Sequence, residues 1–410
     1  MSEASSAMNL QSLQNYVRDA VAIRRIARLQ PAGGAGDKVF PPTYKGGKYA
    51  TEDRLIAGQK KPCVLLDSVQ SQANRMELAL LAAARAGKIP LPIVEVDFTK
   101  AIPEVGVITS LEAPHRIADA ILRDSVLGGK KFRDTDEGKA FTDATAQNGT
   151  ELFRLCPTAL VFGMWNSTGP KGGLGIKFQR AMVSELVGVD AVPGVKTSSR
   201  IDPLQILLGA GPLYATADGG WTLAEDEAKK DTGKAAKLGK EGKPSEANHG
   251  NVTPTLEDGH GGVTLEYARQ TVVLSLPALR RLHFPVAGAG AADSAKPAAA
   301  DLAARTALAA LGLCAAALAI EDGCDLRSRC CLVPEPGQGG WEIVKADGTT
   351  EAFTLTGEVA CGLLKEAVAA AKSAGLPWLE KPLTLTPSAG LAELVRRSRN
   401  LAMQSPDEGE

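Results

Sequence analysis

Residues 63–75 read CVLLDSVQSQANR, and they predict the local structure around them. An apolar strand ends at Asp67, and a helix opens at Ser68 and closes at Gly87. The start of a helix presents free backbone N–H groups and the positive end of the helix dipole, which together form a cradle for phosphate. The stretch therefore predicts a strand-to-helix turn that can hold an anion.

The polar residues of this helix start are mainly hydrogen-bond donors. At helical spacing Ser71 and Arg75 share one face, and Gln70 and Asn74 share the next. Such groups suit binding of a nucleic-acid backbone better than bond cleavage. In the alternative interpretation, a serine only caps the helix and the amides are solvated. The predicted RNA-binding residues of this segment are Ser68, Gln70, Ser71, Gln72, Asn74 and Arg75.

The segment resembles the signature of the backbone subunit of type I-G (formerly I-U) CRISPR surveillance complexes, in the Cas-seven group of the RAMP superfamily. Seven further blocks keep one order along the chain, from about position 40 to about position 330. Individually these blocks are weak motifs, and jointly they are specific. They are PPTY at 41–44, APHR at 113–116, FGMW at 162–165, FQR at 178–180, SELVG at 184–188, SLPALRR at 275–281 and DLRSRC at 325–330.

Strands and helices alternate irregularly with long insertions, which fits an α+β sandwich better than a doubly wound sheet. The resemblance implies a specific fold, an RRM-like (ferredoxin-like) palm with long finger and thumb insertions. It implies a single elaborated domain over residues 1–410, with insertions at 31–61 and 218–262 as finger or thumb. Residues 286–300 then form a linker, and residues 301–410 form helices and strands that pack on the palm.

The bulk composition excludes a uniformly basic nucleic-acid binder, because 46 basic residues are balanced by 47 acidic ones. A local basic groove stays possible, since the local field attracts phosphate. Aromatic residues make up only 4% of the chain, which disfavours a general single-strand binder with many stacking platforms. Seven scattered cysteines indicate reduced thiols of a cytoplasmic protein.

Neither a metal site nor a membrane anchor is expected. The spacing of Cys324, Cys330 and Cys331 does not fit paired zinc ligands. The beginning of the sequence lacks the pattern of a signal peptide. The longest apolar stretch, Thr306 to Ile320, has 15 residues and is short for a membrane span. It predicts a buried core helix.

Two further segments carry candidate RNA-binding residues. His115 and Arg116 lie at a predicted helix start, where the alternative is a solvated salt-bridge stripe formed by Arg116, Asp119 and Arg123. Trp165 precedes a glycine-rich turn and could stack on a base or pack in the core. The turn lacks the spacing of a Walker loop. The basic candidates that flank it are Lys171, Lys177 and Arg180.

Lys196 and Arg200 belong to a small cluster of basic and hydroxyl residues. Arg327 and Arg329 would point to one face of a strand and could line a groove. The competing account pairs these two arginines with nearby acids, Glu321, Asp322 and Asp325.

The resemblance implies a non-catalytic subunit without cofactor that coats a CRISPR guide RNA in a head-to-tail filament of its own copies. The implied partners are a guide-processing and capping subunit, a large subunit, a target DNA strand and a separate helicase-nuclease. Target choice would rest on base pairing. The alternative function is a metal-dependent ribonuclease of the RAMP type that uses Asp37 or Asp67.

Overall fold

The computed structural model describes residues 7–166, 177–286 and 295–404, which divide into two compact units. The first unit comprises residues 1–43, 49–191 and 265–393, and the second comprises residues 44–48, 192–264 and 394–410. The fold is of the α+β class, as the sequence predicts, because its main sheet is antiparallel and does not alternate strand by strand with helices.

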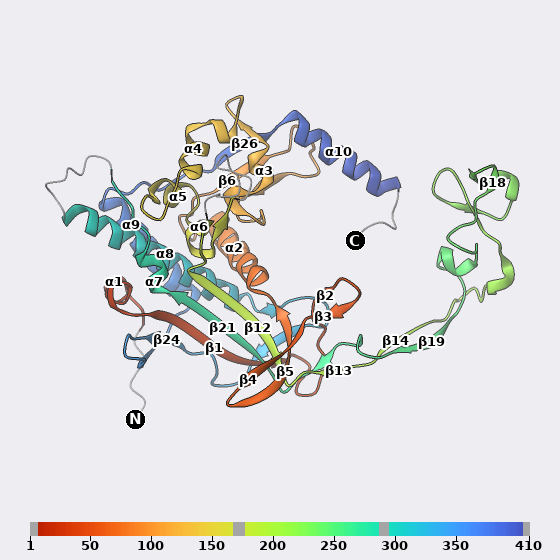
Figure 1. Ribbon diagram of the computed structural model, residues 1–410, viewed down its shortest axis with the longest axis horizontal. Helices are drawn as coiled ribbons and strands as arrows, with labels where there is room; N and C mark the ends of the chain where they lie inside the picture. The colour runs from red at the N-terminus through yellow and green to blue at the C-terminus, as the bar shows by residue number, and fades with distance from the viewer. Residues whose placement is uncertain (1–6, 167–176, 287–294, 405–410) are drawn as a thin grey trace. The chain divides into compact units, whose positions relative to one another are not determined.

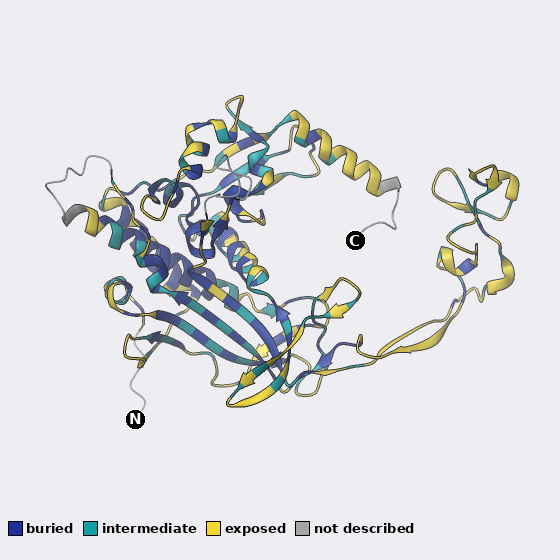
Figure 2. Ribbon diagram, in the orientation of Figure 1, coloured by how far each residue is buried: buried dark blue, intermediate teal, exposed yellow. Residues whose placement is uncertain are grey.

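A nine-stranded sheet organises the first unit (Figure 1). Its main path runs β22-β23-β1-β21-β12-β5-β4, and β24 and β25 extend it beside β1. Burial alternates along the central strands, so one face meets the core and the other is half-solvated (Figure 2). The strands are β1 (Ala22–Pro31), β4 (Thr51–Ile56), β5 (Gln59–Asp67), β12 (Met182–Val189), β21 (Tyr267–Ser275), β22 (Cys324–Asp325), β23 (Cys331–Pro334), β24 (Trp341–Val344) and β25 (Thr350–Phe353).

Helix α8 (Ala295–Glu321) is the centre of the core and packs against α1 (Leu10–Asp19), α2 (Val69–Arg85), α6 (Pro157–Phe162), α7 (Leu276–Arg280) and α9 (Gly357–Ser373). Its small residues allow close approach, since a Cβ at Gly312 would lie 3.0 Å from Met182 Sδ. By length and composition α8 could cross a membrane, but 78% of its most apolar window is buried inside the protein. The expected core helix at Thr306–Ile320 is confirmed.

The expected linker at 286–300 is wrong over its second half, where α8 already begins. Alanine is the best helix former, and Pro297 is tolerated because it lies in the first turn. Residues 287–294 lie outside the described residues.

A five-stranded sheet, ordered β7-β6-β26-β8-β9, also belongs to the first unit. Short helices surround it, and α10 (Ala389–Gln404) follows β26 in the chain. The elements are β6 (Val94–Asp97), β7 (Val107–Thr109), β8 (Ser125–Leu127), β9 (Lys130–Lys131), β26 (Leu383–Pro387), α3 (Ala120–Arg123), α4 (Asp136–Thr142), α5 (Thr150–Leu155) and the 3₁₀ helices η1 (Arg116–Ala118) and η2 (Phe132–Asp134).

The insertion expected at 31–61 is corrected in part, because β4 belongs to the edge of the main sheet. Ala57 and Gly58 both have positive φ (49° and 79°), as a tight hairpin turn between β4 and β5 requires. Alanine is unusual at the first of these positions, so the sequence lacks the residue pattern by which such a hairpin is normally predicted. The chain before β4 forms β2 (Thr43–Tyr44) and β3 (Lys48–Tyr49).

The second unit consists mainly of short exposed hairpins. The chain leaves the main sheet after β12 and returns at β21, so this excursion is longer than the insertion expected at 218–262. Its strands pair as β13 (Val192–Pro193) with β20 (Val263–Thr264), β14 (Lys196–Arg200) with β19 (Val252–Glu257), β15 (Tyr214–Ala215) with β16 (Trp221–Thr222), and β17 (Lys230–Asp231) with β18 (Lys234–Ala235); its 3₁₀ helices are η3 (Leu208–Ala210), η4 (Glu225–Glu227) and η5 (Pro244–Ala247).

Candidate nucleic-acid interface

The start of α2 is capped in the way the alternative interpretation predicts. The hydroxyl of Ser68 accepts a hydrogen bond from the Ser71 amide at 3.2 Å, so Ser68 is the N-cap residue. Gln70 and Asn74 are exposed on the first turns, and Ser71 is half-buried. Capping and anion binding are compatible here, because a cap satisfies only part of the free amides of a helix start.

Asp67 is the hub of this region, although only 1% of its surface is exposed. Its carboxylate accepts hydrogen bonds from Gln72 Nε2 at 2.6 Å and from Arg75 Nε at 3.0 Å. Arg327 Nη2 lies 3.5 Å from the other carboxylate oxygen. One buried acid at the end of β5 thus positions two arginines from segments far apart in the sequence.

Gln72 lies in the interior, which corrects its prediction as a surface donor. Its side-chain oxygen accepts hydrogen bonds from Ser184 Oγ at 2.8 Å and from Gln270 Nε2 at 3.1 Å. Gln270 in turn accepts a hydrogen bond from Arg25 Nη1 at 2.8 Å. The chain of buried polar groups links α2 to β12, β21 and β1, so Gln72 fixes the helix on the sheet.

The guanidinium of Arg75 is partly exposed and braced from two sides. Its Nη2 donates to the carbonyl of Leu326 at 2.8 Å, besides the ion pair with Asp67. Arg327 lies in the turn between β22 and β23, and Arg329 has a φ of 57°. The expected strand over this pair is therefore wrong, and the two side chains do not share a strand face.

Arg327 pairs with Asp67 and not with Glu321, one of the acids expected as its partner. The carboxylate of Glu321 instead accepts a hydrogen bond from the amide of Gly357 at 2.6 Å. Arg329 stacks on Phe40, with its Cζ atom 4.7 Å from the ring centroid. Arg75 and Arg327 thus meet at a single buried acid, and Arg329 lies nearby in the sequence on the ring of Phe40. This excess of positive charge at the end of β5 can attract a phosphate.

Two of the cysteines beside this cluster have raised pKa values. Burial raises the pKa of Cys324 to about 12 and also raises the pKa of Cys330, so both thiols stay protonated at neutral pH. Zinc binds the thiolate. Within residues 7–166, 177–286 and 295–404, no three His, Cys, Asp or Glu side chains group as metal ligands would.

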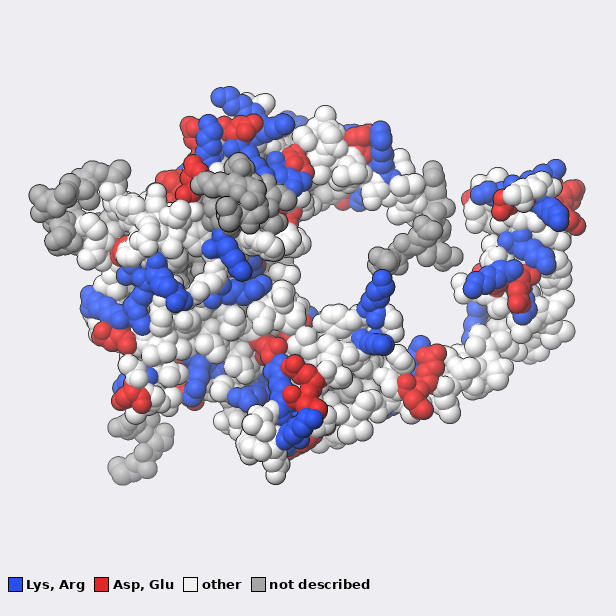
Figure 3. Space-filling view, viewed as in Figure 1, with Lys and Arg blue, Asp and Glu red and all other residues white. Residues whose placement is uncertain are grey.

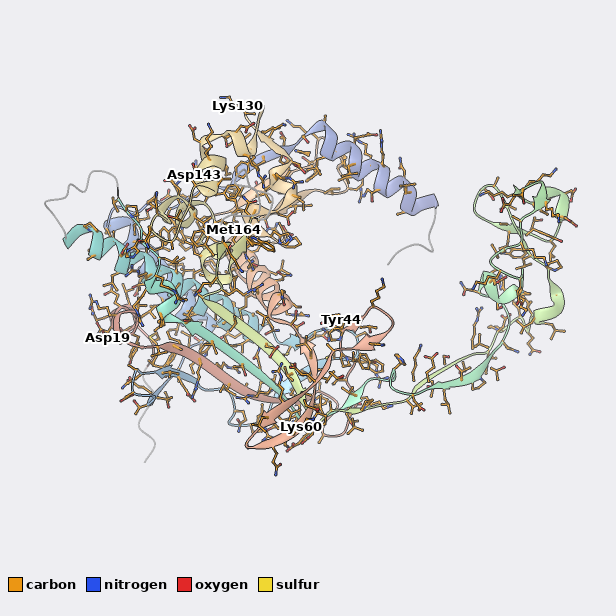
Figure 4. The ribbon with its side chains drawn as sticks, in the orientation of Figure 1. Asp19, Tyr44, Lys60, Lys130, Asp143 and Met164 are labelled. Atoms are coloured by element: carbon orange, nitrogen blue, oxygen red, sulfur yellow. The ribbon has the colours of Figure 1, made fainter. Side chains whose placement is uncertain are left out.

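A second basic cluster lies on the hairpin of β10 (Met164–Trp165) and β11 (Lys177–Phe178). Trp165 is 59% exposed and pairs with Lys177 across the hairpin, so it is not a core residue. Arg180 follows on an exposed stretch. Figure 4 labels Met164 at the start of β10. Lys171, a candidate of the same turn, lies outside the described residues.

Arg116 is buried, which corrects its prediction as a surface residue on a guide phosphate. Its guanidinium forms a two-point ion pair with Glu77 of α2, at 2.7 Å for each hydrogen bond. It also donates to the carbonyl of Gly163 at 3.0 Å, directly before β10. Arg116 therefore attaches the Trp165 hairpin to α2 and acts as a positioning residue.

The stripe expected from Arg116, Asp119 and Arg123 is absent, because the described chain breaks there into η1 and α3. Asp119 instead caps α3 through the Ile121 amide at 2.9 Å. His115 remains exposed at the start of η1.

In the second unit, Lys196 and Arg200 lie on the exposed strand β14. Lys196 pairs with Glu257 of β19 at 3.0 Å. Since both partners are exposed, this ion pair contributes little to stability and leaves the lysine available to a phosphate.

The ribonuclease alternative does not fit Asp67. A carboxylate that is buried and bonded to Gln72, Arg75 and Arg327 cannot reach an RNA backbone or hold a metal ion without breaking the hub. Asp37 is exposed and accepts the amide of Lys38 at 2.9 Å.

Sequence analysis did not single out the arginines of the half-solvated sheet face, which are Arg24, Arg28, Arg54 and Arg269. In β1, the signal for Arg24 and Arg28 was the alternation of polar with apolar residues along the strand. Figure 3 shows basic and acidic side chains interspersed on the visible face, in keeping with a net charge of −1.

Comparisons with known proteins give one informative match. The crystal structure of Thermofilum pendens Csc2 matches with a TM-score of 0.28 and 11% identity, over 95% of this chain and 79% of that chain; at this TM-score the likeness carries no argument. No curated protein matches the chain. The model of a family described as CRISPR-associated protein GSU0053 matches residues 23–193. Over this segment, which contains Asp67, Gln72 and Arg75 as well as Trp165, the chain is similar to a CRISPR-associated family.

Proposed function

We propose that this chain is a non-catalytic subunit that binds a CRISPR guide RNA as one of several identical copies. One observation carries the proposal. The family match over residues 23–193 includes the start of α2 with Arg75 and the hairpin with Trp165 and Lys177. The segment related to a CRISPR-associated family therefore also holds the groups suited to RNA.

The two clusters offer different contacts to RNA. Arg75, Arg327 and Arg329 would hold backbone phosphates by charge-assisted hydrogen bonds. Trp165 would stack on a base, with Lys177 beside it for a neighbouring phosphate. Neither cluster has the geometry that reads one base, so the guide would be held by its backbone and by stacking.

In this proposal the main sheet with α2 and α8 serves as the RRM-like palm of the RAMP superfamily. The β2–β3 region and the long excursion at 192–264 serve as finger and thumb, and all parts belong to one elaborated domain. Lys196 and Arg200 on β14 give the excursion a basic strand that could follow the guide. His115, Gln70, Ser71, Asn74 and Arg180 stay candidates for direct contacts.

The copies would assemble head to tail, because a heterologous interface that does not close generates a filament. The filament would belong to a cytoplasmic type I-G complex with a guide-processing and capping subunit, a large subunit and a separate helicase-nuclease. Base pairing between guide and target DNA strand would then provide specificity. The engagement of Asp67 favours this non-catalytic role over RNA cleavage.

The proposal is tested by purifying the chain together with a CRISPR array and extracting its nucleic acid. We expect a discrete RNA of repeat-spacer composition that resists added ribonuclease while bound. Heterogeneous RNA without repeat sequence, or no RNA, would contradict the proposal. Incubating the purified protein with unrelated RNA and divalent metal ions tests the alternative, because a ribonuclease would cut it.

A further inference from the structure

Two arginines lie directly opposite each other on the half-solvated face of the main sheet. In the pairing of β1 with β21, Arg28 is the partner of Arg269. Like charges at such positions repel each other and destabilise a sheet. The Nε atom of Arg28, like that of Arg269, is buried without a hydrogen-bond partner among the described residues. The charge of Arg28 is nevertheless compensated, since this atom lies 3.2 Å from Glu335 and the guanidinium lies 3.8 Å from the ring centroid of Tyr267.

Arg269 lacks such compensation. Its Nε atom is buried and has no hydrogen-bond partner among the described residues, although the side chain as a whole is only half-buried. A buried donor without a partner costs stability, and a second cation across the strand adds to the cost. An unfavourable arrangement of this kind indicates a site whose missing partner is an anion.

A cleft of about 400 Å³ lies on the same side of the sheet and is lined by Arg269. The β4–β5 hairpin forms one wall, because Arg54 reaches from β4 to Glu185 of β12 at 2.8 Å. Figure 4 labels Lys60 in this hairpin. The wall also carries Leu55, which is 77% exposed, while Val183, Val187 and Thr271 line the sheet side.

We propose that this cleft binds one nucleotide of a single-stranded RNA. The phosphate would lie against Arg269, where the charge of Arg28 strengthens the attraction. The base would enter between Leu55 and the valines of β12, and Thr271 and Glu185 would meet polar edges of the nucleoside. The ligand class follows from the combination of cation, hydroxyl and apolar wall in a cavity of a size usual for small ligands.

An acidic protein segment is the competing occupant, since it would also satisfy Arg269. The cleft favours the nucleotide. A carboxylate would contact only Arg269, whereas a nucleotide would contact Arg269 through its phosphate and the apolar walls through its base. The inference deepens the proposed function by adding an RNA contact on the sheet face. It does not depend on the α2 or Trp165 clusters.

The test is titration of a labelled hexauridylate with the purified protein freed of nucleic acid. Arg269→Gln should lower the affinity about tenfold, as expected for one lost charge-assisted contact, and should reduce the slope of log affinity against log salt by about one. Its thermal melting should stay unchanged or rise, because the repulsion with Arg28 is removed. Arg281→Gln is the control, because it removes the same charge from an exposed arginine that lies outside the cleft.

Leu55→Asp is a second variant. Its effect on RNA affinity cannot be due to unfolding, since the Leu55 side chain is largely exposed. An acid on the wall should repel the phosphate, whereas Leu55→Asn should have a small effect. Equal losses for Arg269→Gln and Arg281→Gln would overturn the proposal. Unchanged RNA affinity together with weakened self-association of Arg269→Gln would assign the cleft to an acidic protein segment instead.

The results also separate this inference from the proposed function. If wild-type protein carries guide RNA and the two arginine variants bind hexauridylate equally, only the cleft assignment fails. If wild-type protein carries no guide RNA but its binding of hexauridylate depends on Arg269, the cleft assignment stands and the guide-binding role fails.

Discussion

Asp67 shows how a single buried residue can organise a surface. Its carboxylate meets Gln72 and Arg75 from α2 and Arg327 from the β22–β23 turn. The sequence predicts Asp67 as a strand end and Arg75 on the adjacent helix. It cannot predict that a turn 260 residues away completes the cluster, because that contact depends on the tertiary fold.

The arginines around Asp67 should differ in their contribution to stability. Arg75→Ala removes an ion pair to a buried acid and should lower the free energy of unfolding by about 1–2 kcal/mol. Arg329→Ala loses only a stacking contact on Phe40, worth about 0.5–1 kcal/mol. Both variants should lose RNA loading, measured as bound RNA per protein. If melting falls for Arg75→Ala while RNA loading is unchanged, Arg75 is structural only.

The Glu77–Arg116 pair should control the pH dependence of stability. Burial raises the pKa of Glu77 to about 7, although Arg116 opposes the shift. A folded-state pKa above the unfolded one means that this group's contribution is complete at low pH and is lost as the pH rises toward 7. Arg116→Leu leaves the carboxylate without its buried partner, so it should cost about 3–5 kcal/mol at neutral pH and much less at pH 5.

Thermal melting between pH 5 and pH 8 checks this expectation. The double variant Glu77→Gln, Arg116→Leu carries no charge at the site and should lose the additional pH dependence. Equal destabilisation of Arg116→Leu at both ends of the range would show that the carboxyl group does not titrate as the burial predicts.

At the scale of elements, periodicity predicted the long segments well. The sequence pattern predicts a strand over 182–189 and a helix over 357–373, and β12 and α9 have these bounds. Helix α2 differs from its predicted bounds by two residues or fewer at each end. The short apolar run at 158–162 predicts a strand, but these residues form α6. A short apolar run that is buried on all sides has no period that distinguishes a strand from a helix. The sequence also predicts one helix over roughly 136–155. The structure divides this stretch into α4 and α5, with non-helical chain between them that includes Asn148 and Gly149.

The β10–β11 hairpin presents Trp165 to solvent, so its ring should matter for binding and little for folding. Trp165→Ala should weaken RNA binding by about 1–3 kcal/mol, as expected for one lost stacking contact. Trp165→Phe should restore part of the affinity, since a smaller ring still stacks. Titration with a short RNA and thermal melting measure both effects. A large melting loss with unchanged affinity would show that the indole packs against the protein.

The excursion at 192–264 can be removed at a position where its two ends meet. The amide of Gly194 donates to the carbonyl of Gly262 at 2.8 Å, so a two-residue turn can replace residues 195–261. The melting of the first unit should stay nearly unchanged, because the main sheet and α8 remain complete. RNA loading should fall through loss of Lys196 and Arg200.

Limited proteolysis provides the matching measurement on the intact chain. Between Glu225 and Glu246 the chain has six lysines, six acidic residues and few apolar ones, which predicts that Trp221–His260 is mobile in the free subunit. Many residues there are exposed, so we expect rapid cutting. Protection in the assembled complex is expected. Equal resistance with and without RNA would mean that the segment is already packed.

For the whole molecule, the balanced charge conceals local clusters of basic residues. A net charge of −1 excludes a uniformly basic surface, yet basic residues gather near Asp67, at the Trp165 hairpin and on the sheet face. The first two clusters were predicted from motifs in the sequence. The third depends on strand register, which aligns Arg28 with Arg269 across 241 positions in the chain and which no local pattern reveals.

Sizing and sequencing the RNA that copurifies with the chain, expressed with a CRISPR array, tests the central claim most directly. We predict a discrete RNA of repeat-spacer composition, present in wild-type protein and reduced in Arg75→Ala and Trp165→Ala. Its binding should weaken as salt rises, because the contacts are directed at the backbone. Copurified RNA of random length and sequence, or protein free of RNA at low salt, would contradict the account.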